Sequence, residues 1–127
     1  MPTLHFEDFR KGDRREFGNC LVTREAIVAF ARRYDPQPFH LDEAQACESL
    51  LGGLAASGWH TVSLLMRMNC DEYLVDSSSM GGPGVKEIRW RKPVRPGDRL
   101  RARSEVLEAR ASRSRPERRS CGCTSCP

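Results

Sequence analysis

One segment, residues 58–75 (GWHTVSLLMRMNCDEYLV), sets the architecture that the rest of the chain has to complete. Wound as an α-helix, it carries apolar side chains over most of its circumference, namely Trp59, Val62, Leu64, Leu65, Met66, Met68 and Cys70. Ser57 stands where its hydroxyl can cap the first turn. A helix that is apolar on nearly all sides is a buried one, so we expect the other elements to surround it.

Two shorter helices are predicted before this segment. One face of residues 23–34 collects the apolar side chains Ile27, Phe30, Ala31 and Tyr34. Thr23 is a suitable N-cap for this helix, and Asp35 ends it because the residue before a proline is disfavoured in the α region. Asp42 caps the second helix, residues 42–51, which a Gly-Gly pair closes.

The remaining apolar patterns are those of strands. Residues 16–22 (EFGNCLV) read as a short strand. Residues 85–90 (VKEIRW) and residues 92–111 read as two more strands joined through a Pro-Gly-Asp turn. Helices followed by antiparallel strands indicate an α+β domain, and 127 residues fit one such domain.

The C-terminal sixteen residues do not continue this pattern. Two or three strands are too few to cover a long central helix, so more strands are expected after residue 111. Residues 112–127 (SRSRPERRSCGCTSCP) instead contain no Val, Ile, Leu or aromatic residue, which predicts disorder. We therefore divide the chain into a C-terminally incomplete domain, residues 1–111, and a disordered Arg/Cys-rich tail, residues 112–127.

The six cysteines do not indicate a disulfide framework. Cys20, Cys47 and Cys70 are scattered through apolar segments, where a reduced cysteine behaves as a small hydrophobe. The other three lie in the tail as CGCTSC, residues 121–126, and lack a clear fourth ligand for zinc. We therefore expect no metal site.

The charges and the apolar windows constrain location and partners. The first sixteen residues mix both charge signs and the longest apolar window is interrupted by Gly, Ser, His and Arg, so we expect a cytoplasmic protein without a membrane span. Residues 1–85 carry 8 Lys and Arg against 12 Asp and Glu, whereas residues 86–127 carry 13 against 5. This basic half suits phosphate groups or is a solvated face. Nucleic acid is a weak candidate, because Trp90 is the only aromatic residue there.

The stretch YDPQPFH, residues 34–40, carries the strongest indication of chemistry. Pro36 and Pro38 stiffen it, so Asp35 and His40 are held together at little entropic cost. A carboxylate and an imidazole can hold one water molecule between them and move its protons. The structural alternative is that Asp35 caps a turn and His40 bonds the backbone.

The stretch ASGWH, residues 56–60, supplies a second element. Gly58 at a helix start exposes backbone N–H groups at the positive end of the helix dipole, which suits a developing oxyanion. The alternative is that Gly58 permits close packing under Trp59. We interpret His60 as a packed or hydrogen-bonded helix residue rather than a catalytic one.

The runs FARRYDPQPFHLDEAQA, GLAASGWHT and GVKEIRWRKPVRPGDRL together resemble the MaoC-like family of (R)-specific enoyl-CoA hydratases and acyl dehydratases. The hydratase motif of that family is approximately Asp-x-Asn-Pro-aliphatic-His, and Asp35, Pro38 and His40 match its acid, proline and histidine. The resemblance covers roughly residues 5–115. It implies a hotdog fold, an antiparallel sheet wrapped around a long central helix and here missing its last two strands, and a homodimer.

The resemblance also implies roles for individual residues. Asp35 and His40 would be the catalytic pair that activates water, and Gly58, with Ser57 beside it, would bind the thioester carbonyl. The reaction would be reversible hydration of a trans-2-enoyl-CoA in fatty acid metabolism, with the CoA thioester as substrate and no further cofactor. The basic residues of 86–103 would help to hold the CoA phosphates. Which member of the pair is base and which is acid stays open.

The chain departs from the family at several positions. Gln37 stands where Asn is usual, Phe39 replaces a smaller aliphatic residue, and Ser57 occupies a position that is often His. We interpret these departures as a different acyl pocket. The family continues with two strands where residues 112–127 stand, so we interpret the tail as a shifted reading frame or a truncated copy. A non-catalytic or degenerate acyl-thioester-binding protein is the alternative function, and a hotdog thioesterase is disfavoured by the Asp/His loop.

Overall fold

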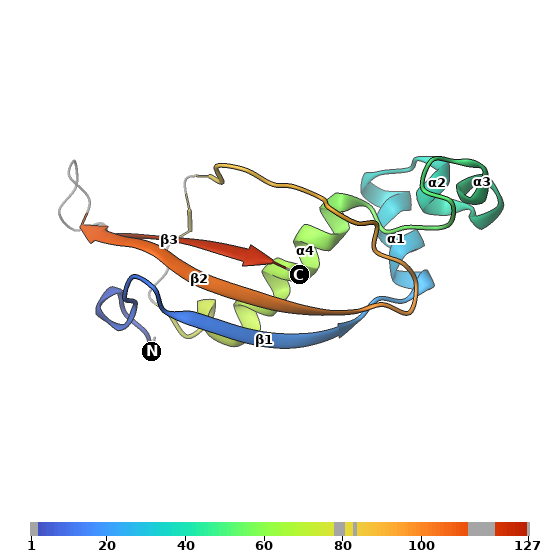
Figure 1. Cartoon of the computed structure of the whole chain (residues 1–127). Coiled ribbons are helices and arrows are strands. Elements are labelled where there is room, and N and C mark those ends of the chain that lie inside the picture. The colour runs from blue at the N-terminus through green and yellow to red at the C-terminus, as the bar shows by residue number, and fades with distance from the viewer. Residues whose placement is uncertain (1–2, 78–80, 83, 112–118, 127) are drawn as a thin grey trace. The chain divides into compact units, whose positions relative to one another are not determined.

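The computed structural model describes residues 3–77, 81–82, 84–111 and 119–126 (Figure 1). The chain divides into two compact units. We call residues 1–18, 65–83 and 101–127 the sheet unit, and residues 19–64 and 84–100 the helical unit. The longest elements contribute residues to both units, and Asp35, His40, Ser57 and Gly58 all lie in the helical unit.

The sheet unit is built on strands β1 (Arg14–Leu21), β2 (Arg99–Ala111) and β3 (Arg119–Cys126), in the order β1-β2-β3 (Figure 1). A short 3-10 helix, η1 (Phe6–Asp8), precedes β1. Backbone bonds from Gly12 N to Val106 O and from Val106 N to Asp13 O, 2.7 and 2.9 Å long, tie the approach to β1 to the middle of β2.

Helix α4 (Gly58–Asn69) continues into a single turn of π-helix, η2 (Cys70–Leu74). Together they confirm the predicted long helix of residues 58–75, but its burial on nearly all sides is wrong. Trp59 and Met66 are 57% and 53% exposed. Within the sheet unit, Met68 is buried and packs against Gly18. The rings of Tyr73 and Phe17 meet edge-on, with their centroids 6.1 Å apart. The apolar circumference is therefore only partly covered by the described chain.

The helical unit contains α1 (Arg24–Tyr34), α2 (Pro38–Leu41) and α3 (Glu43–Glu48). Two of the three predicted N-caps are confirmed: Thr23 accepts a hydrogen bond from Ala26 N and Asp42 accepts one from Gln45 N, each 3.1 Å long. The buried core of this unit consists of Val22, Ile27, Ala31, Ala46, Leu54, Ala55, Ala56 and Leu100. Within the stretch YDPQPFH, Pro38 begins the short helix α2, because a proline in the first turn of a helix costs no hydrogen bond.

Two predictions of strand and tail differ from the structure. Residues 84–98 form no strand among the described residues. Their backbone instead bonds the loop that precedes α4, where Ala56 N donates to Val94 O. The predicted disorder of residues 112–127 is wrong for β3, which pairs antiparallel with β2 from Arg103–Cys126 to Ala111–Arg119. Backbone pairing requires no apolar side chains, so the composition could not reveal it. Residues 112–118 and 127 lie outside the described residues.

We predict that Gly18→Ala destabilises the protein more than Gly12→Ala. Both glycines have positive φ, +83° and +91°, so either alanine costs about 1–2 kcal/mol of backbone strain. A Cβ on Gly12 meets no atom within 4 Å, whereas one on Gly18 collides with the thioether of Met68. Urea unfolding of both variants measures the difference. Met68→Ala should lower the free energy of unfolding less in the Gly18→Ala background than in the parent chain, because it removes the collision.

Candidate active site

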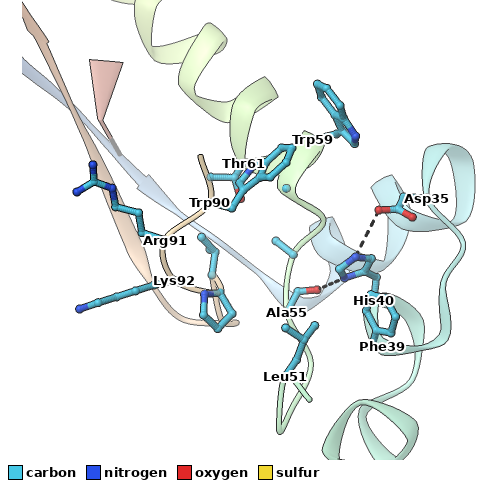
Figure 2. Close-up of a pocket in the computed structure, with 14 residues that line it drawn as sticks. Asp35, Phe39, His40, Leu51, Ala55, Trp59, Thr61, Trp90, Arg91 and Lys92 are labelled. Carbon is cyan, nitrogen blue, oxygen red and sulfur yellow. Dashed lines mark hydrogen bonds and ion pairs between the residues drawn. The ribbon is translucent and has the colours of Figure 1, made fainter. Parts of the chain in front are cut away.

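A cavity of about 380 Å³ lies in the helical unit (Figure 2). One part of its wall is polar and is formed by Asp35, His40, Gly58 and Thr61. The apolar part consists of Phe39, Leu51, Ala55, Ala56, Trp59, Trp90, Pro93 and Val94. Arg91 and Lys92 complete the lining and are exposed to solvent.

Asp35 is held by both of its carboxylate oxygens. It follows the last residue of α1 and donates its backbone N–H to Ala31 O at 2.9 Å. Gln37 Nε2 donates to Oδ1 at 2.6 Å and Ser57 Oγ donates to Oδ2 at 2.7 Å. Its side chain is only 17% exposed. The carboxylate is therefore fixed in direction by one neighbour in its own loop and one from the residue before α4.

His40 bridges this carboxylate and a backbone carbonyl (Figure 2). Its Nδ1 lies 2.7 Å from Ala55 O, and its Nε2 lies 3.4 Å from Asp35 Oδ2. A carbonyl oxygen only accepts, so Nδ1 carries a hydrogen and donates it. That assignment leaves Nε2 as the nitrogen that faces the carboxylate, and Nε2 is the atom that can exchange a proton in the cavity.

The surroundings of Asp35 favour its ionised form. Burial raises the pKa of this carboxyl, but the hydrogen bonds from Ser57 and Gln37 and the charge of His40 lower it by more. The net pKa lies below the ordinary value of 3.8, so Asp35 is an anion at neutral pH. An anion that faces Nε2 is suited to hold a proton on that nitrogen or to share a bound water molecule with it.

Gly58 begins α4 on the wall of the same cavity. The bond from Thr61 N to Ser57 O is the first of the helix, and no described residue accepts the N–H of Gly58. A Cβ at this position would lie 2.6 Å from Trp90 Nε1 and 2.8 Å from Trp90 Cδ2. The packing alternative is correct in kind, but the indole against Gly58 is that of Trp90 and not that of Trp59. The binding of an oxyanion by the N–H of Gly58 stays a prediction.

The structure places the predicted residues together and changes one role. Asp35, His40 and Gly58 line the cavity, whereas Ser57 is fully buried, does not line it, and donates to Asp35. The hydrogen of its hydroxyl goes to the carboxylate, and among the described residues no backbone N–H is seen to donate to Ser57 Oγ, so the predicted cap is not found. The two structural alternatives for Asp35 and His40 also hold in part, since Asp35 ends α1 and His40 bonds a backbone carbonyl.

Sequence reasoning missed two groups that hold the pair. The carbonyl of Ala55 cannot be recognised from its residue type, because any residue could supply it. Gln37 stands out in the sequence only as a departure from the family motif, yet its side-chain amide donates to Asp35 Oδ1. His60, which was not counted as catalytic, stacks on Phe30 with ring centroids 4.8 Å apart, and burial lowers its pKa, so it packs as a neutral ring.

Comparison with known proteins agrees with this architecture. Residues 10–120 match the family described as MaoC like domain. A MaoC-like dehydratase from Rhodospirillum rubrum has a crystal structure that is 45% identical, with a TM-score of 0.84, over 94% of this chain and 81% of that chain. A 3-hydroxybutyryl-CoA dehydratase of Methylorubrum extorquens is 30% identical over 98% of this chain and 76% of that protein. An R-hydratase from Pseudomonas aeruginosa is 25% identical, with a TM-score of 0.62, over 81% of this chain and 64% of that chain.

These likenesses define the class as a hotdog protein with an antiparallel sheet and a central helix, which confirms the predicted fold class. The chain belongs to the MaoC-like family, and the similar proteins are named as two dehydratases, one of them for 3-hydroxybutyryl-CoA, and one R-hydratase. In the described part of the chain, no helix is both long and apolar enough to cross a membrane. Among the same residues, no three His, Cys, Asp or Glu side chains are grouped to hold a metal ion.

We predict that Ser57→Ala raises the pKa of Asp35 and makes the protein less stable at neutral pH. The lowered pKa stabilises the fold above pH 3.8, and this contribution is lost as the pH falls through the folded-state value. A hydrogen bond to a charged group contributes about 1.5–3 kcal/mol, so the variant should lose that much at pH 7 and progressively less as the pH falls below 3.8 and the carboxyl becomes protonated. Urea unfolding across pH and NMR titration of the carboxyl measure the effect. Ser63→Ala, at an exposed serine of α4, is the matched control.

Proposed function

We propose that this protein catalyses the reversible hydration of a trans-2-enoyl-CoA to a 3-hydroxyacyl-CoA. The observation that carries the proposal is the geometry at Asp35 and His40: an ionised carboxylate lies 3.4 Å from Nε2 on the wall of a cavity that Gly58 also lines. The membership in a family of thioester hydratases and dehydratases supports it.

A water molecule between Asp35 and His40 would find two acceptors. With Nδ1 donating to Ala55 O, a neutral His40 presents the lone pair of Nε2, and Asp35 presents its carboxylate oxygens. Each accepts one hydrogen of the water, which leaves an oxygen lone pair free to attack. Fixing both acceptors on buried groups pre-orients the nucleophile without cost at the moment of reaction.

The bond changes of the proposed reaction balance within this pair. The water oxygen forms a bond to C3 of the enoyl thioester while the pair takes one proton from the water. The π electrons of the C2–C3 double bond move to the carbonyl, whose oxygen becomes an enolate stabilised by the N–H of Gly58. The pair then returns one proton to C2, and the enolate collapses to the thioester. Dehydration of a 3-hydroxyacyl thioester is the same path reversed.

The rest of the cavity suits an acyl thioester. The side chains of Phe39, Leu51 and Val94 offer apolar surface to an acyl chain, as ligand pockets commonly do. Arg91 and Lys92 place two exposed positive charges at the same cavity, where phosphate groups of CoA can pair with them. The homodimer, the cytoplasmic location and the need for no further cofactor, all predicted above, belong to this proposal.

We expect Asp35→Asn and His40→Ala each to lower kcat for crotonyl-CoA hydration by at least about 100-fold, the usual contribution of a general acid or base. Loss of absorbance of the enoyl thioester follows the reaction directly. Glu25→Gln on an exposed position of α1 is the control and should leave the rate unchanged. Variants that hydrate crotonyl-CoA as fast as the parent chain would contradict the proposal.

The alternative, a non-catalytic acyl-thioester-binding protein, makes a different prediction. A parent chain that unfolds cooperatively and binds crotonyl-CoA in calorimetry but produces no 3-hydroxybutyryl-CoA would favour it. Measurable hydration by a cooperatively folded parent chain excludes it. A hotdog thioesterase would instead release free CoA thiol, which a thiol reagent detects in the same assay.

We expect Arg91→Met/Lys92→Met to raise KM for crotonyl-CoA about threefold to tenfold with little change in kcat. Exposed ion pairs are individually weak, so two of them support only a modest effect, which added salt should reduce in the parent chain. The same thioester carried on phosphate-free pantetheine is the control substrate, and its KM should not change. An equal rise in KM for both substrates would contradict a role in phosphate binding.

A further inference from the structure

We propose that Arg95 is a positioning residue, which holds the loop whose carbonyl fixes the orientation of His40. This inference rests on the proposed function. It adds a residue that lies outside the Asp/His motif and whose side chain contacts backbone atoms rather than the catalytic side chains.

Arg95 ties the loop before α4 through its guanidinium. Nη2 donates to Leu51 O, and Nη1 donates to Leu54 O at 3.4 Å. A Cβ on Gly53 would lie 2.9 Å from Nη1, so the guanidinium lies close over the middle of this turn. The arginine is itself anchored, because its backbone N–H donates to Asp98 Oδ2 at 2.9 Å.

These bonds flank the carbonyl that His40 uses. Leu54 is bonded to Arg95, and Ala56 N donates to Val94 O at 2.9 Å, so the residues on both sides of Ala55 are fixed. Peptide planarity then leaves the Ala55 carbonyl little freedom to turn away from Nδ1, 2.7 Å distant. Ala55 is 1% exposed, so water does not readily replace this bond. Arg95 therefore acts on the tautomer and direction of the imidazole through the backbone.

The chemistry of the side chain agrees with this role. An arginine offers five N–H donors in a rigid fork, which can serve two carbonyl oxygens at once, whereas a lysine presents a single ammonium on a flexible stem. Among the described residues, no carboxylate lies within ion-pair distance of this guanidinium. The hydrogen bonds of its guanidinium go to these two carbonyls, so its removal leaves partly buried acceptors of the loop without this donor.

The first test is steady-state kinetics of Arg95→Met and Arg95→Lys with crotonyl-CoA. We expect Arg95→Met to lower kcat about 10- to 100-fold while KM changes less than about threefold, because misplacement of a catalytic group slows the reaction more than binding. Arg95→Lys should lie in between. Arg10→Met, at an exposed arginine of the sheet unit, is the control for lost charge. An unchanged kcat for Arg95→Met would overturn the inference.

The second test combines Arg95→Met with His40→Ala. If Arg95 acts through His40, Arg95→Met should lower kcat less than about twofold in the His40→Ala background, instead of the 10- to 100-fold expected in the parent chain. Equal losses in both backgrounds would show a general structural role and overturn the inference. A slow His40→Ala variant beside a fully active Arg95→Met variant would preserve the proposed function and reject only the role of Arg95.

The third test does not depend on activity. The chain has 3 histidines, so the imidazole signals of His40 in 15N-labelled protein can be assigned by comparison with His40→Ala. We expect a protonated Nδ1 with slow hydrogen exchange in the parent chain and in Arg10→Met, and its loss in Arg95→Met. A Nδ1–H signal that persists unchanged in Arg95→Met would overturn the inference even if the parent chain hydrates no thioester.

Discussion

The hydrogen bond from Ser57 Oγ to Asp35 Oδ2, 2.7 Å long, joins the end of α1 to the start of α4 across 22 positions of sequence. A partly buried carboxylate is costly unless donors satisfy it, and here the hydroxyl of Ser57 and the side-chain amide of Gln37 donate to one anion. Because these donors come from two separate segments, the loop YDPQPFH and the residues before α4 have to fold together. The local fold therefore depends on the hydrogen bonds that hold the Asp35 carboxylate in the candidate site.

His40 satisfies two requirements with its two nitrogens. Nδ1 meets a buried carbonyl, and Nε2 meets the carboxylate. His60 shows the contrast, because its Nδ1 is buried without a hydrogen-bond partner among the described residues and its ring stacks on Phe30. Burial alone thus makes His60 a neutral packing ring, whereas His40 has a carbonyl at one nitrogen and an anion at the other, and its proposed role in proton transfer rests on that arrangement.

The parts of this structure that could be predicted from the sequence are the parts set by local chemistry. Thr23 and Asp42 cap helices because their side chains bond backbone N–H groups three residues ahead, an interaction within one turn. Residues 85–90 and the start of residues 92–111 are predicted as strand, yet Trp90 packs on Gly58 and Val94 O accepts from Ala56 N. Those contacts link positions far apart in sequence, so no local pattern reveals them.

The candidate site divides in the same way. Asp35, His40 and Gly58 could be named because proline stiffness and a glycine at a helix start restrict what their neighbourhood can do. The role of Ser57 could not, since a serine before a helix is more often a cap, and its bond goes instead to a residue of another segment. Ala55 contributes only a carbonyl, for which residue type carries no information.

Two of the three departures from the family pattern, Gln37 and Ser57, are physically linked through Asp35. Gln37 is longer by one methylene than the usual Asn, and Ser57 is shorter than the His often found at its position. Each now donates to a different oxygen of the same carboxylate, at 2.6 and 2.7 Å. The short side chain of Ser57 lets the carboxylate lie close to the start of α4. The longer side chain of Gln37 still reaches the other carboxylate oxygen. The pair of changes therefore keeps the anion satisfied on both oxygens, which neither change by itself explains.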